Sequence, residues 1–150
     1  METPNPVKVG PVRIGKGCPL ALIAGPCVME PNDLTLTIAR RLSEICGALG
    51  VPLIFKASFD KANRTSKSSY RGIGLDEGIK VFQRVKDATG LPVTTDVHET
   101  QQAAPIAEVV DLLQVPAFLA TLPPHRTFSK ARRQQVLDRV QLAIAGRDDR

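Results

Sequence analysis

Aromatic residues are scarce in this sequence of 150 residues, which has no tryptophan, one tyrosine and five phenylalanines. Proteins that bind single-stranded nucleic acid without sequence preference stack the bases on aromatic side chains, so a surface of that kind is not expected here. The net charge of +5 does not reverse this conclusion. Residues 121–150 carry 7 Lys and Arg against 3 Asp and Glu, whereas residues 1–120 carry 13 against 12. We therefore expect no nucleic-acid partner.

Cysteine is also rare, and Cys18, Cys27 and Cys46 form no CxxC pair. An odd number at wide spacing argues against a disulfide framework and for a reducing compartment. No apolar run approaches the ~20 residues that span a bilayer. Residues 1–6 lack the basic start and apolar centre of a signal peptide. These absences predict a protein of a reducing compartment with no membrane partner.

Strand-like and helix-like hydrophobic patterns alternate along the first 115 residues. Alternating apolar residues around a Gly-Pro pair predict a β-hairpin at 7–14. Apolar runs and helical periodicity then predict four strands, at 20–24, 52–55, 91–95 and 109–115, and three helices, at 34–49, 75–88 and 101–108. Alternating strands and helices predict an α/β fold with parallel strands.

The first of these four strands and the helix after it carry two further local predictions. The run Leu20-Ala21-Leu22-Ile23-Ala24 is apolar throughout, which is typical of a strand buried on both faces. Asn32 or Asp33 precedes the first apolar position of the helix, so we expect one of them to cap it.

Polar groups follow each of the four strands at the point where it ends. In chain order they are Cys27, the cluster at 56–65, Asp96 with His98, and Gln114. Because parallel α/β folds bind ligands at the carboxyl edge of the sheet, we expect these groups to share one rim.

The cluster at 56–65 holds Lys56, Lys61 and Arg64 among hydroxyl and amide side chains. Lysine supplies a compact charge and arginine a two-pronged donor, a combination that suits phosphate. Asp60 is expected to hold some of these cations by charge pairing. Two other interpretations stay open, a Schiff-base lysine and a simple solvated loop.

The other strand-end groups each allow two interpretations. Cys27 is either a small apolar residue or a metal ligand that needs further His or carboxylate partners. Asp96 and His98 are either such partners or an orienting hydrogen-bond pair. The glycine run at 71–78 is interpreted as a turn that enters a helix. It does not follow a strand directly, and its third glycine comes one place too late for a dinucleotide loop.

Five motifs together resemble one family. They are AGPCVMEP at 24–31, FKASFDKANRTS at 55–66, SYRGIGLDEG at 69–78, TDVHET at 95–100 and LLQVPAFLA at 112–120. In this order they resemble the 3-deoxy-D-manno-octulosonate 8-phosphate synthases, also called 2-dehydro-3-deoxyphosphooctonate aldolases. The resemblance implies that residues 1–120 form the N-terminal half of a (β/α)8 TIM barrel. It also implies a homo-oligomeric, cytoplasmic enzyme that condenses phosphoenolpyruvate with D-arabinose 5-phosphate and water, releasing phosphate and a lipopolysaccharide precursor.

The resemblance also implies roles for individual residues. Lys61 and Asp96 would be catalytic, with Asp96 near the sugar. Phosphoenolpyruvate would be surrounded by Lys56, Ser58, Lys61, Gln114 and Ala117. The phosphate of arabinose 5-phosphate would be held by Asn63, Arg64 and Thr65, partly across a subunit contact; Thr65 stands where serine is common. Cys27 resembles a ligand of the metal-dependent members, which implies a divalent metal whose other ligands are absent from this chain.

The motifs end at about residue 120, and the chain changes character there. Residues 121–150 are rich in arginine, and 129–146 are expected to form an amphipathic helix. This change suggests a truncated or frameshifted reading frame, and we expect half a barrel to be inactive alone. Two alternatives remain. One is the related 3-deoxy-7-phosphoheptulonate synthase, which uses erythrose 4-phosphate, and the other is a non-catalytic phosphate-binding remnant.

Overall fold

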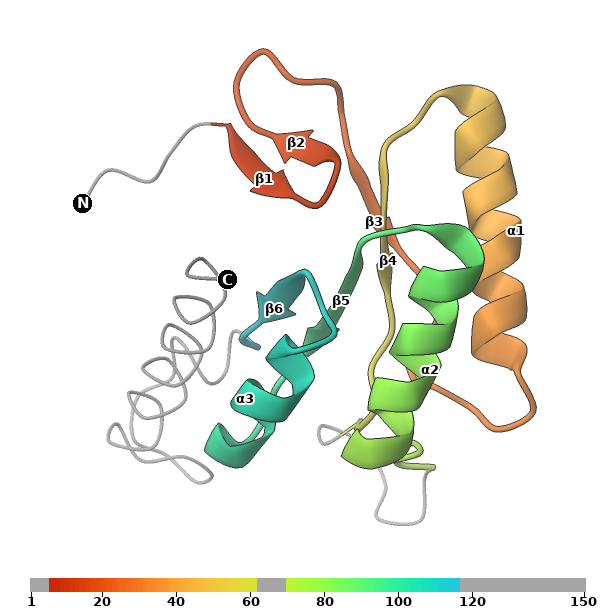
Figure 1. The fold of residues 1–150 in the computed structure, drawn as a ribbon, viewed down its shortest axis with the longest axis vertical. Helices are drawn as coiled ribbons and strands as arrows, with labels where there is room; N and C mark the ends of the chain where they lie inside the picture. The colour runs from red at the N-terminus through yellow and green to blue at the C-terminus, as the bar shows by residue number, and fades with distance from the viewer. Residues whose placement is uncertain (1–5, 62–69, 117–150) are drawn as a thin grey trace.

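Nine helices and strands lie within residues 6–61 and 70–116, the part of the chain that the computed structural model describes. Their bounds are β1 (Val7–Val9), β2 (Val12–Ile14), β3 (Leu22–Ala24), α1 (Leu34–Leu49), β4 (Leu53–Lys56), α2 (Leu75–Thr89), β5 (Val93–Asp96), α3 (Thr100–Ala107) and β6 (Leu112–Gln114) (Figure 1). Each corresponds to an element that the sequence predicts. The helix expected at 129–146 lies outside the described residues.

The strands β3 to β6 form one parallel sheet whose spatial order, β3-β4-β5-β6, follows the chain. A helix connects β3 to β4, β4 to β5 and β5 to β6, as parallel neighbours require. The hairpin β1-β2 is antiparallel and separate. The prediction of an α/β fold with a parallel sheet is therefore confirmed. In these residues the sheet is open, with β3 and β6 at its edges.

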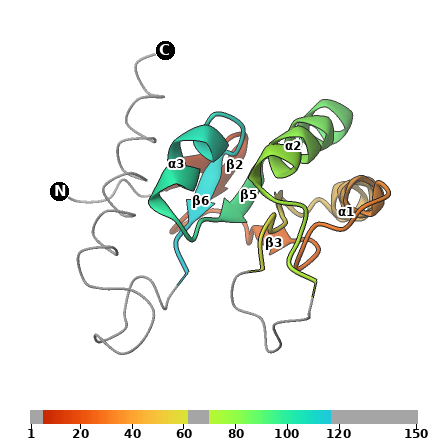
Figure 2. The same cartoon turned by 90° about the horizontal axis from the view of Figure 1, so that it is seen from below.

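The two faces of the sheet are covered by different elements. All three helices lie on one face, where Phe55, Phe82, Val93 and Ile106 are fully buried in the main hydrophobic core (Figure 2). The hairpin contacts the other face near the beginning of the strands, and there its valines pack with Ile54. We call this second face the inner face. None of the described helices has the length and apolar character needed to cross a bilayer.

The expectation that the strand at 20–24 is buried on both faces is wrong. Leu22 and Ile23 are 41% and 46% exposed. The reason is its place in the sheet, because among the described residues β3 pairs with β4 alone. An edge strand has a paired strand on one side only, so fewer side chains pack against it.

The predicted cap of α1 is corrected as well. Asp33 does occupy the N-cap position, but its backbone is left-handed with φ of 57°, and its side chain makes no capping hydrogen bond. The carboxylate instead lies 2.8 Å from Arg84 Nη1 of α2. Asp33 therefore links the two helices, which already pack on each other, rather than satisfying the first amides of its own helix.

Candidate functional site

Three predicted site residues are each the last residue of a strand: Lys56 in β4, Asp96 in β5 and Gln114 in β6. Lys56 stands opposite Thr94, and Asp96 stands opposite Gln114. Paired residues of parallel strands point to the same face, and residues two apart on one strand share a face. All three side chains therefore project from the inner face at the carboxyl edge of the sheet. The sheet brings them together as the sequence predicts.

Asp96 is the centre of this group. Its Oδ2 atom accepts a hydrogen bond from His98 Nε2 at 3.1 Å, and its Oδ1 atom lies 3.6 Å from Lys56 Nζ. Of the two interpretations of Asp96 and His98, the structure therefore shows the hydrogen-bonded pair. A separation of 3.6 Å is an ion pair beyond hydrogen-bond range, so Lys56 spends no hydrogen-bond donor on Asp96 Oδ1.

The ionisation of Asp96 follows from these neighbours. Burial alone would raise the pKa of the carboxyl, but the hydrogen bonds of His98 and Ser58 and the charge of Lys56 outweigh burial and lower the pKa to about 2. Asp96 is therefore a carboxylate at neutral pH. It can accept hydrogen bonds, and it has no proton to donate.

Ser58 and Lys61 follow β4 directly. Ser58 is buried, and its hydroxyl donates to the Asp60 carbonyl oxygen at 3.0 Å. A hydroxyl has one proton, so Ser58 can donate either to Asp60 or to Asp96. When it donates to Asp60, Asp96 Oδ1 has no hydrogen-bond partner among the described residues. Lys61 is exposed, and its backbone N–H donates to the carbonyl oxygen of Arg71 at 2.6 Å. The rim thus carries a buried acceptor with spare capacity next to a cation.

Asp60 does pair with a cation, as expected, but the partner lies outside the cluster at 56–65. Arg71 binds both carboxylate oxygens, with Nε at 2.7 Å from Oδ1 and Nη2 at 2.9 Å from Oδ2. In the sequence, Arg71 stands only at the start of the predicted turn, and its pairing with Asp60 was not predicted. The available signal was a single arginine before a G-x-G run, and nothing in that pattern says which carboxylate it meets.

Cys27 lies in the segment that follows β3, as the sequence predicts, and it is exposed. Within residues 6–61 and 70–116, no three His, Cys, Asp or Glu side chains come together in a way that could hold a metal ion. A single thiol does not make such a site, because divalent metals bound by cysteine need several protein ligands. The described residues therefore do not fit a metal by themselves, and the metal role of Cys27 stays a prediction.

Four predicted ligand residues, Asn63, Arg64, Thr65 and Ala117, lie outside the described residues. Their roles stay predictions.

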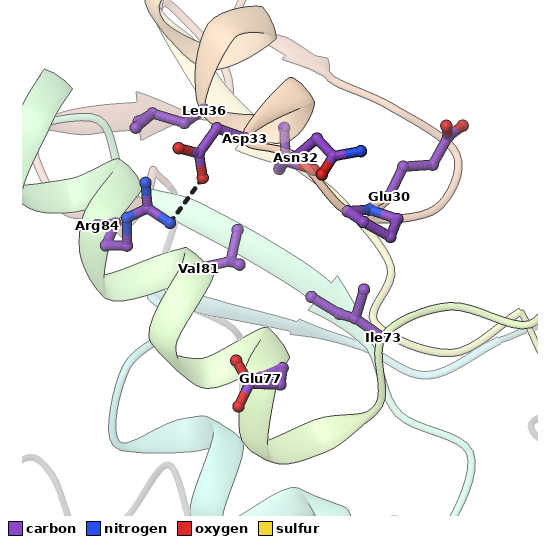
Figure 3. A pocket seen from close by; sticks show the side chains of 10 residues that line it. Glu30, Asn32, Asp33, Leu36, Ile73, Glu77, Val81 and Arg84 are labelled. Carbon is purple, nitrogen blue, oxygen red and sulfur yellow. Dashed lines mark ion pairs between the residues drawn. The ribbon is translucent and has the colours of Figure 1, made fainter.

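A separate pocket of about 270 Å³ lies between α1 and α2, on the helix side of the sheet (Figure 3). Leu36, Ile73 and Val81 supply apolar walls, and Glu30 and Glu77 stand at its margin. Its one arginine, Arg84, already pairs with Asp33. The pocket contains none of the predicted site residues, and no motif in the sequence indicates it.

Comparison with known proteins extends these observations. A sequence profile described as the DAHP synthetase I family matches residues 3–143. The chain belongs to the DAHP synthetase I family. The family match runs past residue 120, where the recognised motifs end. The predicted division of the chain at that residue stays a prediction.

Relatives of this family member carry a narrower name. Proteins called 2-dehydro-3-deoxyphosphooctonate aldolase are 59% identical over 106 residues in a Synechococcus species and 55% identical over 113 residues in Citrifermentans bemidjiense. A third, from Syntrophotalea carbinolica, is 54% identical over 116 residues. These alignments cover 71%, 75% and 77% of this chain but 37%, 41% and 42% of the relatives. The chain thus spans about two fifths of their length.

Proposed function

We propose that this chain carries the N-terminal half of a 2-dehydro-3-deoxyphosphooctonate aldolase site, which binds phosphoenolpyruvate and D-arabinose 5-phosphate. One observation carries the proposal: Lys56, Asp96 and Gln114 end three adjacent parallel strands on the same face. The names of the relatives supply the reaction. The wider fold would be the first half of a (β/α)8 barrel, in which the inner face lines the interior.

The proposed chemistry uses the two charges at the rim. Lys56 and Lys61 would bind the carboxylate and phosphate of phosphoenolpyruvate, with Ser58 and Gln114 supplying further polar contacts and Ala117 nearby. Carbon 3 of the enol attacks the aldehyde of the sugar, water adds at carbon 2, and inorganic phosphate then leaves. Fixed cations stabilise the negative charge that develops on the phosphate and carboxylate groups.

Asp96 would act on the sugar. Its Oδ1 atom lacks a hydrogen-bond partner among the described residues when Ser58 donates to Asp60, although the side chain is only 14% exposed. A sugar hydroxyl is a donor that would satisfy this acceptor, and the open-chain aldehyde would then face the enol. Asn63, Arg64 and Thr65 would hold the sugar phosphate. Orienting two substrates in this way accounts for much of the acceleration in condensation reactions.

The chain alone is proposed to bind without turnover, because the remaining strands would supply further cations and the other metal ligands. Cys27 would be one ligand of a divalent metal only if those residues were present. Cytoplasmic location and a homo-oligomer are part of the same proposal, and both rest on the resemblance.

Three calorimetric titrations test the proposed binding. Phosphoenolpyruvate should bind the 150-residue chain, and arabinose 5-phosphate should bind more tightly than erythrose 4-phosphate. Equal or tighter binding of erythrose 4-phosphate would favour 3-deoxy-7-phosphoheptulonate synthase, the alternative that the family name also fits. Absence of phosphoenolpyruvate binding would contradict the proposal.

A phosphate-release assay, run with and without divalent metal, tests the proposed inactivity. The expected result is no release above the rate with heat-denatured chain. Rapid release that depends on arabinose 5-phosphate would show that the chain completes its site, which would overturn the inactivity while supporting the substrates.

A further inference from the structure

The ion pair between Asp60 and Arg71 joins two residues that flank the segment 62–69. Both carboxylate oxygens are used, at 2.7 Å and 2.9 Å from two nitrogens of the guanidinium. The Asp60 side chain is 12% exposed and that of Arg71 is 63% exposed, so the arginine reaches from the surface onto a nearly buried acceptor. A planar fork on a carboxylate fixes direction as well as distance.

Backbone hydrogen bonds strengthen the same junction. The Lys61 N–H donates to the Arg71 carbonyl oxygen at 2.6 Å, and the Gly74 N–H donates to the Phe59 carbonyl oxygen at 3.0 Å. The stretch that follows β4 and the stretch that precedes α2 are therefore held together by main chain and side chain at once.

Two glycines allow this close approach. Gly72 has φ of +121°, and a Cβ there would overlap the Phe59 carbonyl oxygen. A Cβ on Gly78 would lie 2.6 Å from the Cβ of Phe59. The backbone of residues 72–78 thus lies directly against Phe59, which leaves the Arg71 backbone little freedom. The fork on Asp60 extends that fixed geometry to the residue just before Lys61.

We propose that Arg71 is a positioning residue, which holds Lys61 at the rim through its fork on Asp60 and its carbonyl on the Lys61 amide. Lys61 has a long flexible side chain in an exposed position, so its ammonium is useful to an anion only if its backbone is fixed. Arg71 does not itself contact the ligand in this proposal. The inference rests on the proposed function only for the identity of that ligand.

Hydrogen exchange of the Lys61 amide measures the positioning directly. Its rate is compared with that of the Phe55 amide, which bonds to the Pro92 carbonyl oxygen inside the sheet and serves as an internal reference. We expect Arg71→Gln to accelerate Lys61 exchange, relative to Phe55, by about tenfold, as expected when local opening becomes easier. Arg71→Lys keeps the charge but lacks the fork, and should give an intermediate increase of roughly threefold.

Calorimetric titration of the same variants with phosphoenolpyruvate measures the consequence. The dissociation constant should rise about tenfold in Arg71→Gln and less in Arg71→Lys. The matched control is Arg84→Gln, which removes another arginine–carboxylate pair of 2.8 Å far along α2. It should change neither the Lys61 exchange nor the affinity.

The possible results separate this inference from the proposed function. If Lys61 exchange changes no more in Arg71→Gln than in Arg84→Gln, the positioning role is overturned. Faster Lys61 exchange in Arg71→Gln with unchanged phosphoenolpyruvate affinity also overturns it. So does Arg71→Lys if both its Lys61 exchange and its affinity equal those of the wild type. If the wild type binds no phosphoenolpyruvate, the proposed function fails, and the exchange rates alone decide whether Arg71 holds Lys61. If Arg71→Gln does not fold, Arg71→Lys carries the comparison.

Discussion

Two lysine–aspartate pairs lie at opposite ends of β5, and they differ in how much of their hydrogen-bonding capacity is used. At the start of the strand, Lys86 Nζ lies 3.0 Å from each oxygen of Asp111 and 2.9 Å from the Val109 carbonyl oxygen. Asp111 also accepts the Val93 N–H at 2.9 Å. This pair is saturated by the protein itself and connects α2 to the β5 and β6 strands.

The pair at the other end of β5 is built from the same residue types with similar burial. The side chains of Lys56 and Lys86 are both 29% exposed, and those of Asp96 and Asp111 are 14% and 20% exposed. Yet Lys56 and Asp96 are 3.6 Å apart, and Asp96 Oδ1 has no hydrogen bond among the described residues when the Ser58 hydroxyl donates to Asp60. Charge and burial therefore do not distinguish the proposed binding site from a structural link. Unused hydrogen-bonding capacity does.

Removal of the saturated pair should have the largest effect on stability. Asp111→Ala leaves the buried Val93 N–H without its acceptor and the Lys86 ammonium with the Val109 carbonyl oxygen but no counter-charge, which should lower the free energy of unfolding by about 2–3 kcal/mol. Urea denaturation measures this change. Phosphoenolpyruvate affinity of the folded fraction should stay at the wild-type value, and a specific loss of affinity would mean that the two pairs are not functionally distinct.

Removal of the cation of the Lys56–Asp96 pair should instead affect ligand affinity and leave stability nearly unchanged. Lys56→Gln should weaken phosphoenolpyruvate binding by about tenfold, or ~1.4 kcal/mol, because a direct charge on the anion is lost. Unfolding free energy should change by less than about 0.5 kcal/mol, since the 3.6 Å contact is a partly exposed one. A large stability loss with intact affinity would make Lys56 a structural residue.

Acid titration should reveal the next smaller effect. The pKa of Asp96 is lowered to about 2 in the folded chain, below its ordinary value of about 3.9. A lowered folded pKa contributes stability that is complete above the unfolded pKa and is lost as pH falls from about 4 to about 2. After allowance for solvent screening, the contribution is on the order of 1 kcal/mol.

The control for this titration is Asp96→Asn, which cannot ionise. The stability difference between wild type and Asp96→Asn should shrink as the pH falls across that window. A difference that stays constant from pH 5 to pH 2 would show that the carboxylate is not held in its charged form.

The smallest effect is expected at an exposed pair that serves neither purpose. Lys80 lies 2.7 Å from Glu77 on the surface of α2, with both side chains more than half exposed. Thermal denaturation of Lys80→Ala should show a midpoint close to that of the wild type, and phosphoenolpyruvate affinity should be unaffected. A clear effect on affinity would place ligand binding near the pocket between α1 and α2 instead of at the rim.

The order of elements and the shared rim could be predicted from the sequence because both depend on local pattern. Apolar runs that end in Lys56, Asp96 and Gln114 define strands, and parallel alternation then dictates that their ends meet. The exposure of Ile23 could not be predicted this way. An apolar run indicates a strand but does not say whether it has one neighbour or two.

The ion-pair partners of residues that are far apart in the sequence could not be predicted from local sequence patterns. Asp33 resembles a cap by position, but it pairs with Arg84, which is fifty-one residues later in the sequence. Asp60 stands among cations in the sequence, but it binds Arg71 beyond them. In both cases the partner is selected by helix and strand packing, which the spacing of residues along one segment does not encode.

Amide chemical shifts during a titration with phosphoenolpyruvate test the central claim most directly. If the unsaturated carboxyl edge of the inner face is the anion site, the shifts should concentrate at Lys56, Ser58, Asp96 and Gln114. The amides of Lys86 and Asp111, and those of the pocket residues Glu77 and Arg84, should stay unchanged. Shifts centred on either of those two regions, or no shifts at millimolar ligand, would contradict the account.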